Sequence, residues 1–324
     1  MEAIDNISLI PVLEAAGIKS PSKFIGANTV TTTLEEIKDK HLIPVFVQDN
    51  EPLISQGEFI EAALYVAESV FRNEIITSPA VRVSHPIKGR ISEAKFKPAN
   101  QLMDNEKTIF YERMAFIIEI PSVQSTIGGN TLSLTIGGVK AYNLDNFYAK
   151  RGADQHFKLF IGFKNTVCTN LCVWSDGFVE DVRVRSITEL IDELYNLFNS
   201  FRPEYQLRDM ELLQEKSITE KQFALLIGRA RMYQYLPSKI KKTIPVLKIT
   251  DAQINAVAAG YYKDEYFGNA DNGGIDLWRL YNLLTGANKS SYIDSFLDKG
   301  VNCTGFINQV AEALDNSGSF WFLN

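Results

Sequence analysis

Apolar residues recur at helical spacing near the start of the chain. In the segment 59–71, FIEAALYVAESVF, they return every three or four positions, which is the pattern of an amphipathic helix. Ser55 and Glu58 stand just before it at the spacing of a capping box, which satisfies the free amides of a helix start. Thr33 and Glu36 repeat that spacing. We therefore predict one helix from about residue 56 and a shorter one after Thr33.

The centre of the chain changes to the alternation that is typical of β-strands. Runs rich in aromatic and branched residues follow one another at 108–120, 131–142, 156–163 and 167–174. Short turn sequences separate them, GGN at 128–130 and KN at 164–165, as in hairpins. Strands joined by short connections pair in the antiparallel direction. The run 81–85 predicts one more strand, at the edge of the sheet, that Pro86 ends.

Helical spacing returns after Asp176. Capping-box patterns that begin at Ser186, Ser217 and Thr250 predict three helix starts. Further helices are predicted at 275–284, 291–297 and 306–314, the second of them ended by Gly300. The predicted fold class is α+β: a mainly antiparallel central sheet at about residues 81–175, with an N-terminal helical segment and a helical C-terminal third.

Domain organisation follows from length and from one linker-like segment. A chain of 324 residues allows one large domain or two ordinary ones, at a prior of about 150 residues each. The segment SFRPEYQ lies near residue 200, where the strand-rich part gives way to helices. We predict an α+β sheet domain at 1–200 and a helical region at 201–324 packed on it, or one continuous domain.

Composition indicates a cytoplasmic protein. Hydrophobic residues make up 45% of the chain and charged residues 22%, which suits a well-packed protein. Three cysteines are too few, and odd in number, for a secreted disulfide scaffold. The first residues lack the positive region of a signal peptide, and no apolar run approaches the roughly 18 residues of a membrane span. We expect a cytoplasmic location and no membrane partner.

The segment VCTNLCVWSDG at 167–177 holds Cys168 and Cys172. On a strand, residues four apart share one face but lie about 13 Å apart, at about 3.3 Å per residue. That separation is too long for a disulfide or for two ligands of one zinc ion. Buried structural thiols are therefore favoured over a metal site or a redox pair. Asn170 falls on the same face and needs a hydrogen-bond partner if it is buried.

No motif for a cofactor or for a catalytic nucleophile is present. The string TGANKSS at 285–291 lacks the glycines of a phosphate-binding loop. Ser84 and His85 are neighbours on a predicted strand and would face opposite sides, as would Glu112 and Arg113. We assign neither a cofactor nor a metal ligand set, and we favour a protein that is not an enzyme. A metal-dependent hydrolase stays open through scattered acids, of which the candidates are Glu112, Glu119 and Asp176.

Positive charge is segregated, although the net charge of the chain is −6. The stretch 221–248 contains seven Lys or Arg and no acidic residue, and the stretch 82–97 contains five Lys or Arg, one histidine and a single acid, Glu93. Basic residues interleaved with aromatic ones suit phosphate contact and base stacking, and a solvated helix face gives a similar pattern. The expected nucleic-acid surface consists of Arg82, Lys88, Arg90, Lys95, Lys97, Arg229, Arg231, Tyr233, Tyr235, Lys239, Lys241 and Lys242.

Several segments together resemble a bacterial domain-of-unknown-function family, numbered 3871. They are SHPIKGRISEA, KTIFYERMAFIIEIP, FIGFKNTVCTNLCVWSDG, FALLIGRARMYQYLP and LWRLYNLLTGANKSSYIDSFL. That family is similar to the larger phage- and plasmid-associated family numbered 932, which has a comparable Cys-Thr-Asn turn and a late helix with Trp and Asn. The resemblance runs from about Ser55 to the end. It implies a bacterial cytoplasmic protein, often on mobile elements whose products handle DNA, and it implies no particular reaction.

Three functional hypotheses remain. The first is a nucleic-acid-binding accessory protein of mobile-element type, with single- or double-stranded DNA as its partner, and it predicts salt-dependent binding. The second is a protein-interaction module with a protein partner, which predicts an exposed apolar patch of more than a few hundred Å². The third is the metal-dependent hydrolase, which predicts that its carboxylates converge.

Overall fold

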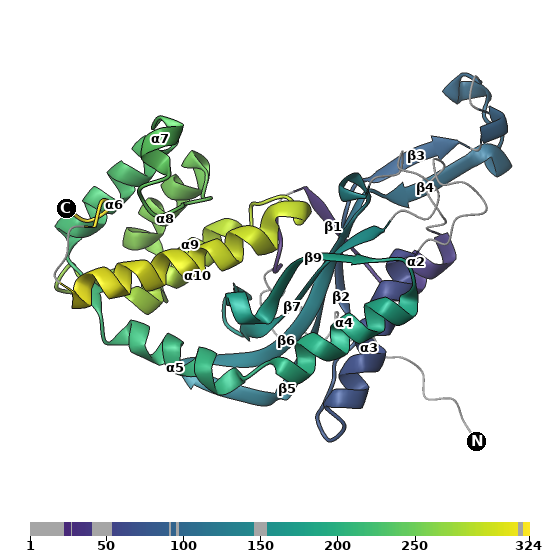
Figure 1. Ribbon diagram of the computed structural model, residues 1–324. Coiled ribbons are helices and arrows are strands. Elements are labelled where there is room, and N and C mark those ends of the chain that lie inside the picture. Colours follow the sequence, from purple (N-terminus) through teal and green to yellow (C-terminus); the bar gives the residue numbers. More distant parts are fainter. Residues whose placement is uncertain are drawn as a thin grey trace, which may run out of the picture.

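A curled antiparallel sheet forms the centre of the molecule (Figure 1). The computed structural model describes residues 23–26, 28–40, 54–90, 92–94, 97–145, 154–316 and 320–324. Within them, seven strands pair in the order β1-β2-β5-β6-β7-β8, with β9 also paired to β7. Their bounds are β1 Thr29–Thr32, β2 Ala80–Ser84, β5 Arg113–Ile127, β6 Asn130–Ala141, β7 Gln155–Asn165, β8 Leu171–Cys172 and β9 Phe178–Val184. The α+β class predicted from the sequence is confirmed.

The longest hairpin joins β5 to β6 through the predicted GGN turn. Ile127 pairs with Asn130, so the loop consists of Gly128 and Gly129 alone. Both glycines have a positive φ, of 56° and 76°, as a two-residue hairpin turn of the type I′ requires. Glycine adopts this backbone conformation without the steric clash that a Cβ atom would bring.

The strand at 81–85 was predicted at the edge of the sheet, and this prediction is wrong. β2 lies between β1 and β5, with Val83 opposite Val30 on one side and Met114 on the other. Pro86 opens the next strand, β3 (Pro86–Arg90), which pairs with β4 (Lys107–Tyr111) in a separate two-stranded sheet. Proline is tolerated at the first position of a strand. The run 108–120 therefore belongs to two sheets and divides at Glu112.

Helices cover both faces of the main sheet. On one face lie α3 (Gln56–Val70) and α4 (Ile187–Ser200), where the ring of Phe59 packs edge-on against Phe116 and Phe157. On the other face lies α10 (Ile293–Asp315), which buries Phe296 and Leu297 against strand residues such as Phe160. Figure 1 shows α3 and α10 on opposite sides of the strands. The short α2 (Leu34–Lys40) packs beside α3.

Local capping signals placed most helix starts correctly. Ser55 and Glu58 form the predicted capping box of α3, and Ser186 caps α4. The predicted cap at Ser217 is wrong, because Thr219 caps the helix together with Gln222 and Ser217 lies in a short strand. The remaining short elements are β10 Ser217–Ile218, β11 Ile275–Asp276 and the 3-10 turns η1 Ser92–Ala94, η2 Ala99–Gln101, η3 Asp104–Glu106, η4 Tyr142–Leu144 and η5 Ser175–Gly177.

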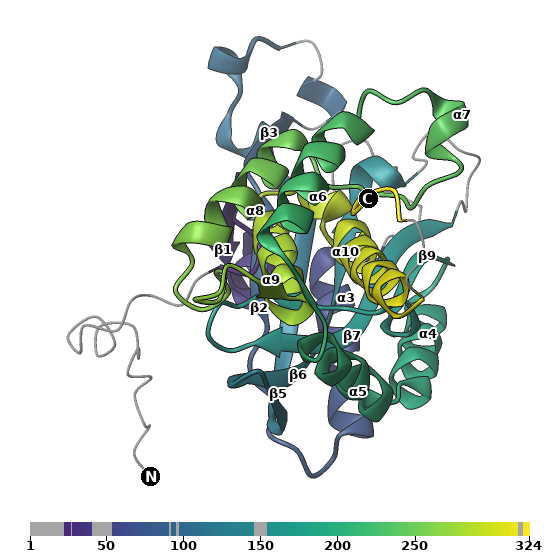
Figure 2. The ribbon, with the colours of Figure 1, turned by 90° about the vertical axis from the view of Figure 1, so that its left-hand side faces the viewer.

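The C-terminal third is mainly helical, and most of its helices pack on α9 or on a helix that does (Figure 2). They are α5 Pro203–Gln214, α6 Glu220–Tyr233, α7 Ser238–Lys241, α8 Asp251–Lys263, α9 Leu277–Asn288 and α10. Two helices separated at Gly300 were predicted where the structure has one continuous α10, in which Gly300 is buried close to Asn288. Leu277, Trp278 and Phe306 join the same hydrophobic core as the sheet. The domain division near residue 200 stays a prediction.

Candidate functional site

The two cysteines of VCTNLCVW lie at a turn and not along one strand. β7 continues to Asn165, the chain turns with Thr169 at a positive φ of 57°, and β8 comprises only Leu171 and Cys172. The strand predicted at 167–174 is therefore confirmed only for Leu171 and Cys172 and is wrong for the other six residues. Cys168 is half-buried, Cys172 is buried, and both are free thiols. Burial raises the pKa of the Cys172 thiol far above its ordinary value, so it is a poor nucleophile.

The amide nitrogen of Asn170 finds a hydrogen-bond partner, whereas its Oδ1 is buried without one among the described residues. Its Nδ2 donates to the backbone oxygen of Asn282 at 2.9 Å, and Asn282 Nδ2 donates in turn to Trp278 O at 3.0 Å. Lys289 Nζ donates to Cys168 O and lies 3.2 Å from Thr169 Oγ1. These contacts fasten the turn to α9. The segment is a structural junction between the sheet and the helical third.

The three acids proposed for a metal have different partners. Glu119 forms an ion pair with Lys164, and Asp176 accepts a hydrogen bond from Gln206 Nε2 at 2.7 Å. Glu112 pairs with Arg113, with 3.4 Å between Oε2 and Nη1. Among the residues that the structure describes, no group of three His, Cys, Asp or Glu could hold a metal ion.

In the first basic stretch, the cationic side chains that the structure describes are bound to other residues of the protein. Arg82 is 3% exposed, and its guanidinium donates to Thr29 Oγ1 at 3.0 Å and to Thr31. Lys97 forms an ion pair with Glu106 at 2.5 Å. The backbones of Lys88 and Arg90 lie in β3, but their side chains, and the whole of Lys95, are outside the described residues.

Part of the second basic stretch is also engaged within the fold. Arg229 donates to the backbone oxygens of Trp321 and Asn324, and its guanidinium lies 5.3 Å from the centre of the Trp321 ring. Arg231 forms an ion pair with Asp251 at 2.8 Å. Tyr233 is only 8% exposed, so its ring belongs to the core and is not accessible for stacking on a nucleobase.

Two lysines and one tyrosine of this stretch are exposed, and their side chains have no ion pair or hydrogen bond to the residues that the structure describes. Tyr235 is 84% exposed, and Lys239 and Lys242 are exposed. Neither lysine has an ion pair to any described residue. Lys241 Nζ donates to Gln234 O at 2.8 Å, and its positive charge belongs to the same short segment as Lys239 and Lys242. We call Tyr235, Lys239, Lys241 and Lys242 the α7 surface.

The two basic stretches lie at opposite ends of the molecule. In Figures 1 and 2, α7 and the β3–β4 ribbon both stand at the upper side, and in Figure 1 they stand at its left and right ends. A ligand that touched both would have to span the helices α9 and α10 that lie between them in Figure 1. The α7 surface is therefore considered by itself.

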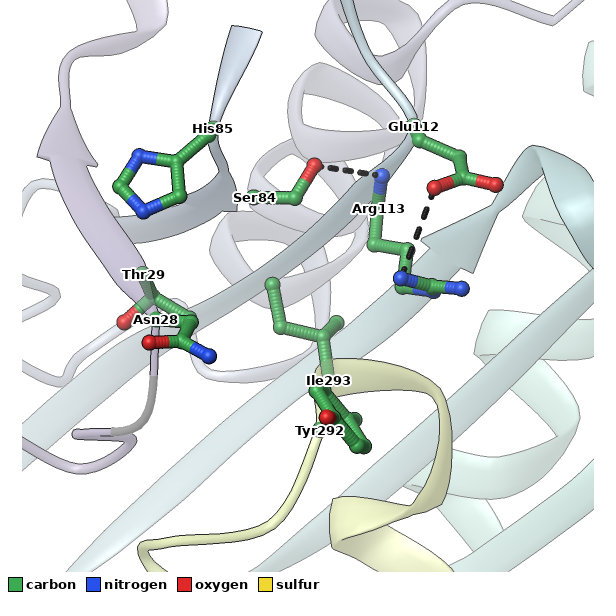
Figure 3. Close-up of a pocket in the computed structure, with 8 residues that line it drawn as sticks. All are labelled: Asn28, Thr29, Ser84, His85, Glu112, Arg113, Tyr292 and Ile293. Atoms are coloured by element: carbon green, nitrogen blue, oxygen red, sulfur yellow. Dashed lines mark hydrogen bonds and ion pairs between the residues drawn. The ribbon is translucent and has the colours of Figure 1, made fainter. Parts of the chain in front are cut away.

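A pocket with a cavity volume of about 220 Å³ opens beside the start of the β3–β4 ribbon. In Figure 3, the imidazole of His85 and the amide of Asn28 lie on one side of it, and Arg113 and Glu112 lie on the other. Ile293, the first residue of α10, lies between these two sides. The complete lining is Asn28, Thr29, Ser84, His85, Glu112, Arg113, Tyr292 and Ile293.

Arg113 is the central charge of this pocket, and it was expected to face away from Glu112. That expectation is wrong, because Glu112 lies in the bend between β4 and β5 and not within one strand, so the alternation rule does not apply. Arg113 Nε also lies 3.3 Å from Asp294 Oδ2 at the start of α10. Its backbone N–H donates to Ser84 Oγ at 3.2 Å. Sequence spacing could not reveal these contacts, since Ser84 and Asp294 are distant along the chain.

The fold defines a class: an α+β protein whose curled antiparallel sheet is covered by helices on both faces, with a pocket between the start of α10 and the β2–β3 junction and an exposed basic helix at one end of the molecule. A family model described as "Domain of unknown function, B. Theta Gene description (DUF3871)" matches residues 6–323. The chain belongs to this family, as its resemblance to family 3871 predicted. No curated protein and no solved structure gives a significant match. None of the described helices is long and apolar enough to cross a membrane.

Proposed function

We propose that the protein is a nucleic-acid-binding accessory protein that contacts single-stranded DNA through the α7 surface. The observation that carries the proposal is the combination of an 84% exposed Tyr235 with the exposed, unpaired side chains of Lys239 and Lys242. An exposed aromatic ring among cations suits a single strand, because unpaired bases stack on the ring while the cations contact phosphates. Double-stranded DNA keeps its bases stacked and offers phosphates alone.

The proposal narrows the surface that was expected from the sequence. Arg82 and Tyr233 are left out because they are buried, and Arg229 and Arg231 because their charges have partners in the fold. Lys97 is left out for the same reason. Lys88, Arg90 and Lys95 stay candidates for a second contact.

The biological setting of the proposal comes from the resemblance stated above. A bacterial cytoplasmic protein of a phage- or plasmid-derived element, related to family 932, would meet single-stranded DNA during replication or transfer of the element. The three free thiols suit a reducing compartment. The setting supports the proposal by association, and the chemistry of the α7 surface supports it directly.

The test is a titration of labelled single-stranded DNA by fluorescence anisotropy across a salt series from about 50 to about 200 mM. The wild type should bind with an affinity that falls steeply with salt. If Lys239 and Lys242 each contact one phosphate, the double variant Lys239→Gln/Lys242→Gln should reduce the slope of log K against log salt by about 1.4. Tyr235→Ala should weaken binding by about 1–3 kcal/mol without changing that slope.

The matched control removes the same net charge elsewhere. Lys38→Gln/Arg72→Gln changes two exposed cations on α2 and after α3 and should leave both affinity and slope unchanged. Equal losses in the two double variants would mean that only net charge matters and would overturn the assignment of the α7 surface. Absence of binding at about 50 mM salt would overturn the proposed function itself.

A second candidate, a protein-interaction module, is favoured by apolar side chains around the same surface. Met232 is 59% exposed and Ile240 is 43% exposed, and both are near Tyr235 in the sequence. Exposed apolar side chains that gather in one place mark protein contact surfaces. Binding to a protein partner through them should depend weakly on salt and should be lost in Met232→Ser, whereas DNA binding should survive that change.

A further inference from the structure

We propose that the pocket between the start of α10 and the β2–β3 junction binds a single unstacked nucleobase that carries an exocyclic amino group. This inference rests on the proposed function and adds to it a site for one base, separate from the α7 surface and next to β1 and the start of α10. The bases with an exocyclic amino group are adenine, cytosine and guanine, whereas thymine has only carbonyl oxygens and one ring N–H at its edge.

The size of the pocket limits the ligand to about one ring system. Its cavity volume is about 220 Å³. Sites for drug-sized ligands measure about 300–1,000 Å³, so a whole nucleotide would not fit inside. A base could enter while its sugar and phosphate stay outside, beside the β3–β4 ribbon in which Lys88 and Arg90 lie.

The lining combines an exposed ring with polar groups on two sides. Tyr292 is 63% exposed at the start of α10, although burial of an aromatic ring is normally favourable. A base stacked on this ring would cover it. His85 and Asn28 would then face one edge of the base, and Glu112 with Arg113 would face the opposite edge (Figure 3).

The charges favour a hydrogen-bond donor over a phosphate. Arg113 is already paired on two sides, with Glu112 at 3.4 Å and with Asp294 at 3.3 Å. A phosphate next to Arg113 would meet both carboxylates at short range, which is unfavourable. A carboxylate accepts a hydrogen bond from an exocyclic amino group, as Glu and Asp do with cytosine. The carbonyl oxygens of thymine would instead be repelled.

The test uses the four free deoxynucleosides as probes with the full chain, observed by saturation-transfer NMR. Because nucleosides have no phosphate, the lysines of the α7 surface do not contribute to this measurement, and the variant Tyr235→Ala subtracts any stacking of the base on that surface. Deoxyadenosine, deoxycytidine and deoxyguanosine should bind saturably. Thymidine should bind at least about tenfold more weakly, because one good hydrogen-bonded contact to a base distinguishes it from the wrong base by at least that factor. Tyr292→Ala should weaken nucleoside binding by about tenfold. Tyr266→Ala, which removes a 58% exposed ring outside the pocket, should have no effect.

The outcomes separate this inference from the proposed function. Binding of DNA through the α7 surface without saturable nucleoside binding would overturn the pocket and leave the proposed function standing. Nucleoside binding that Tyr292→Ala weakens, in a protein that does not bind DNA, would support the pocket and overturn the proposed function. Equal binding of thymidine, or equal losses in Tyr292→Ala and Tyr266→Ala, would overturn the inference. Glu112→Gln provides a second variant, which should reduce the preference for amino-bearing bases while the fold is kept.

Discussion

The ammonium group of Lys140 lies 2.7 Å from the carboxylate of Asp145, in a pair whose side chains are 0% and 4% exposed. The same ammonium lies 4.1 Å from the centre of the Phe157 ring. Burial lowers the pKa of Lys140 to about 8, although Asp145 acts in the opposite direction. The carboxylate also accepts the backbone N–H of His156 at 2.6 Å. This pair ties the end of β6 to the start of β7.

Lys140→Met should lower the free energy of unfolding by about 3–5 kcal/mol, because it leaves the Asp145 carboxylate buried without its cation. Chemical denaturation measures this loss. Lys38→Met is the control, since Lys38 pairs with Glu61 in an exposed pair and should contribute about 0–1 kcal/mol. Similar losses in both variants would contradict the importance of burial.

His156 should make the stability depend on pH below neutrality. Burial lowers its pKa from the ordinary value of 6.5, and Lys158 and Arg183 add to this effect, while Asp181 and Asp145 oppose it. As the pH falls through about 6.5, His156 therefore becomes protonated in the unfolded chain while it stays neutral in the folded chain. The free energy of unfolding thus decreases as the pH decreases through that range. Denaturation midpoints between pH 7.5 and pH 5.5 should fall more steeply for the wild type than for His156→Gln. Parallel profiles would exclude His156 as the cause.

Gly137 occupies a position on β6 at which a side chain does not fit. A Cβ atom there would lie 2.1 Å from Phe116 O and 2.8 Å from the Phe160 ring. Gly137→Ala should lower the free energy of unfolding by about 3 kcal/mol, since a well-packed core resists added atoms. Gly305→Ala on α10, where nothing lies within 4 Å, should instead raise it by about 0.5–1 kcal/mol. Thermal unfolding of the two variants should move in opposite directions.

Asn282 should be essential to the junction between the sheet and α9. It is 1% exposed, and its Oδ1 lies 3.3 Å from Asn170 Nδ2. Asn282→Leu should lower the free energy of unfolding by about 1–3 kcal/mol, because buried amide groups lose their acceptor. Asn199→Leu, at an exposed position of α4, should change it by no more than about 0.5 kcal/mol. If Asn282→Leu leaves the free energy of unfolding unchanged, the hydrogen bonds between Asn170 and Asn282 do not stabilise the junction.

Local signals in the sequence predicted the elements that depend on neighbouring residues. The capping boxes at Ser55 and Thr250 and the Gly128–Gly129 turn were confirmed, because caps and tight turns involve residues two to four apart. Ser217 shows where this fails. Two overlapping patterns, Ser217 with Glu220 and Thr219 with Gln222, compete there, and pairing of Ser217 opposite Asp276 decides between them.

The candidate site could be predicted only in part. The sequence marked the basic stretch and the tyrosines, but it could not separate Tyr233, which is 8% exposed, from Tyr235, which is 84% exposed. It also placed Glu112 and Arg113 on one strand with their side chains on opposite faces, so it did not predict that both line the same pocket. The partners that decide these cases, such as Asp294 for Arg113, come from other elements of the fold.

The sequence by itself therefore determined the α+β class, most helix starts and the principal hairpin, since periodicity, caps and turns act over a few residues. Tertiary structure alone decided which charges are free. Arg82 and Lys140 resemble surface cations in the sequence, yet they are buried against Thr29 and Asp145. Burial of a charge is stable only beside a partner, and a partner is brought into place by the folded chain as a whole.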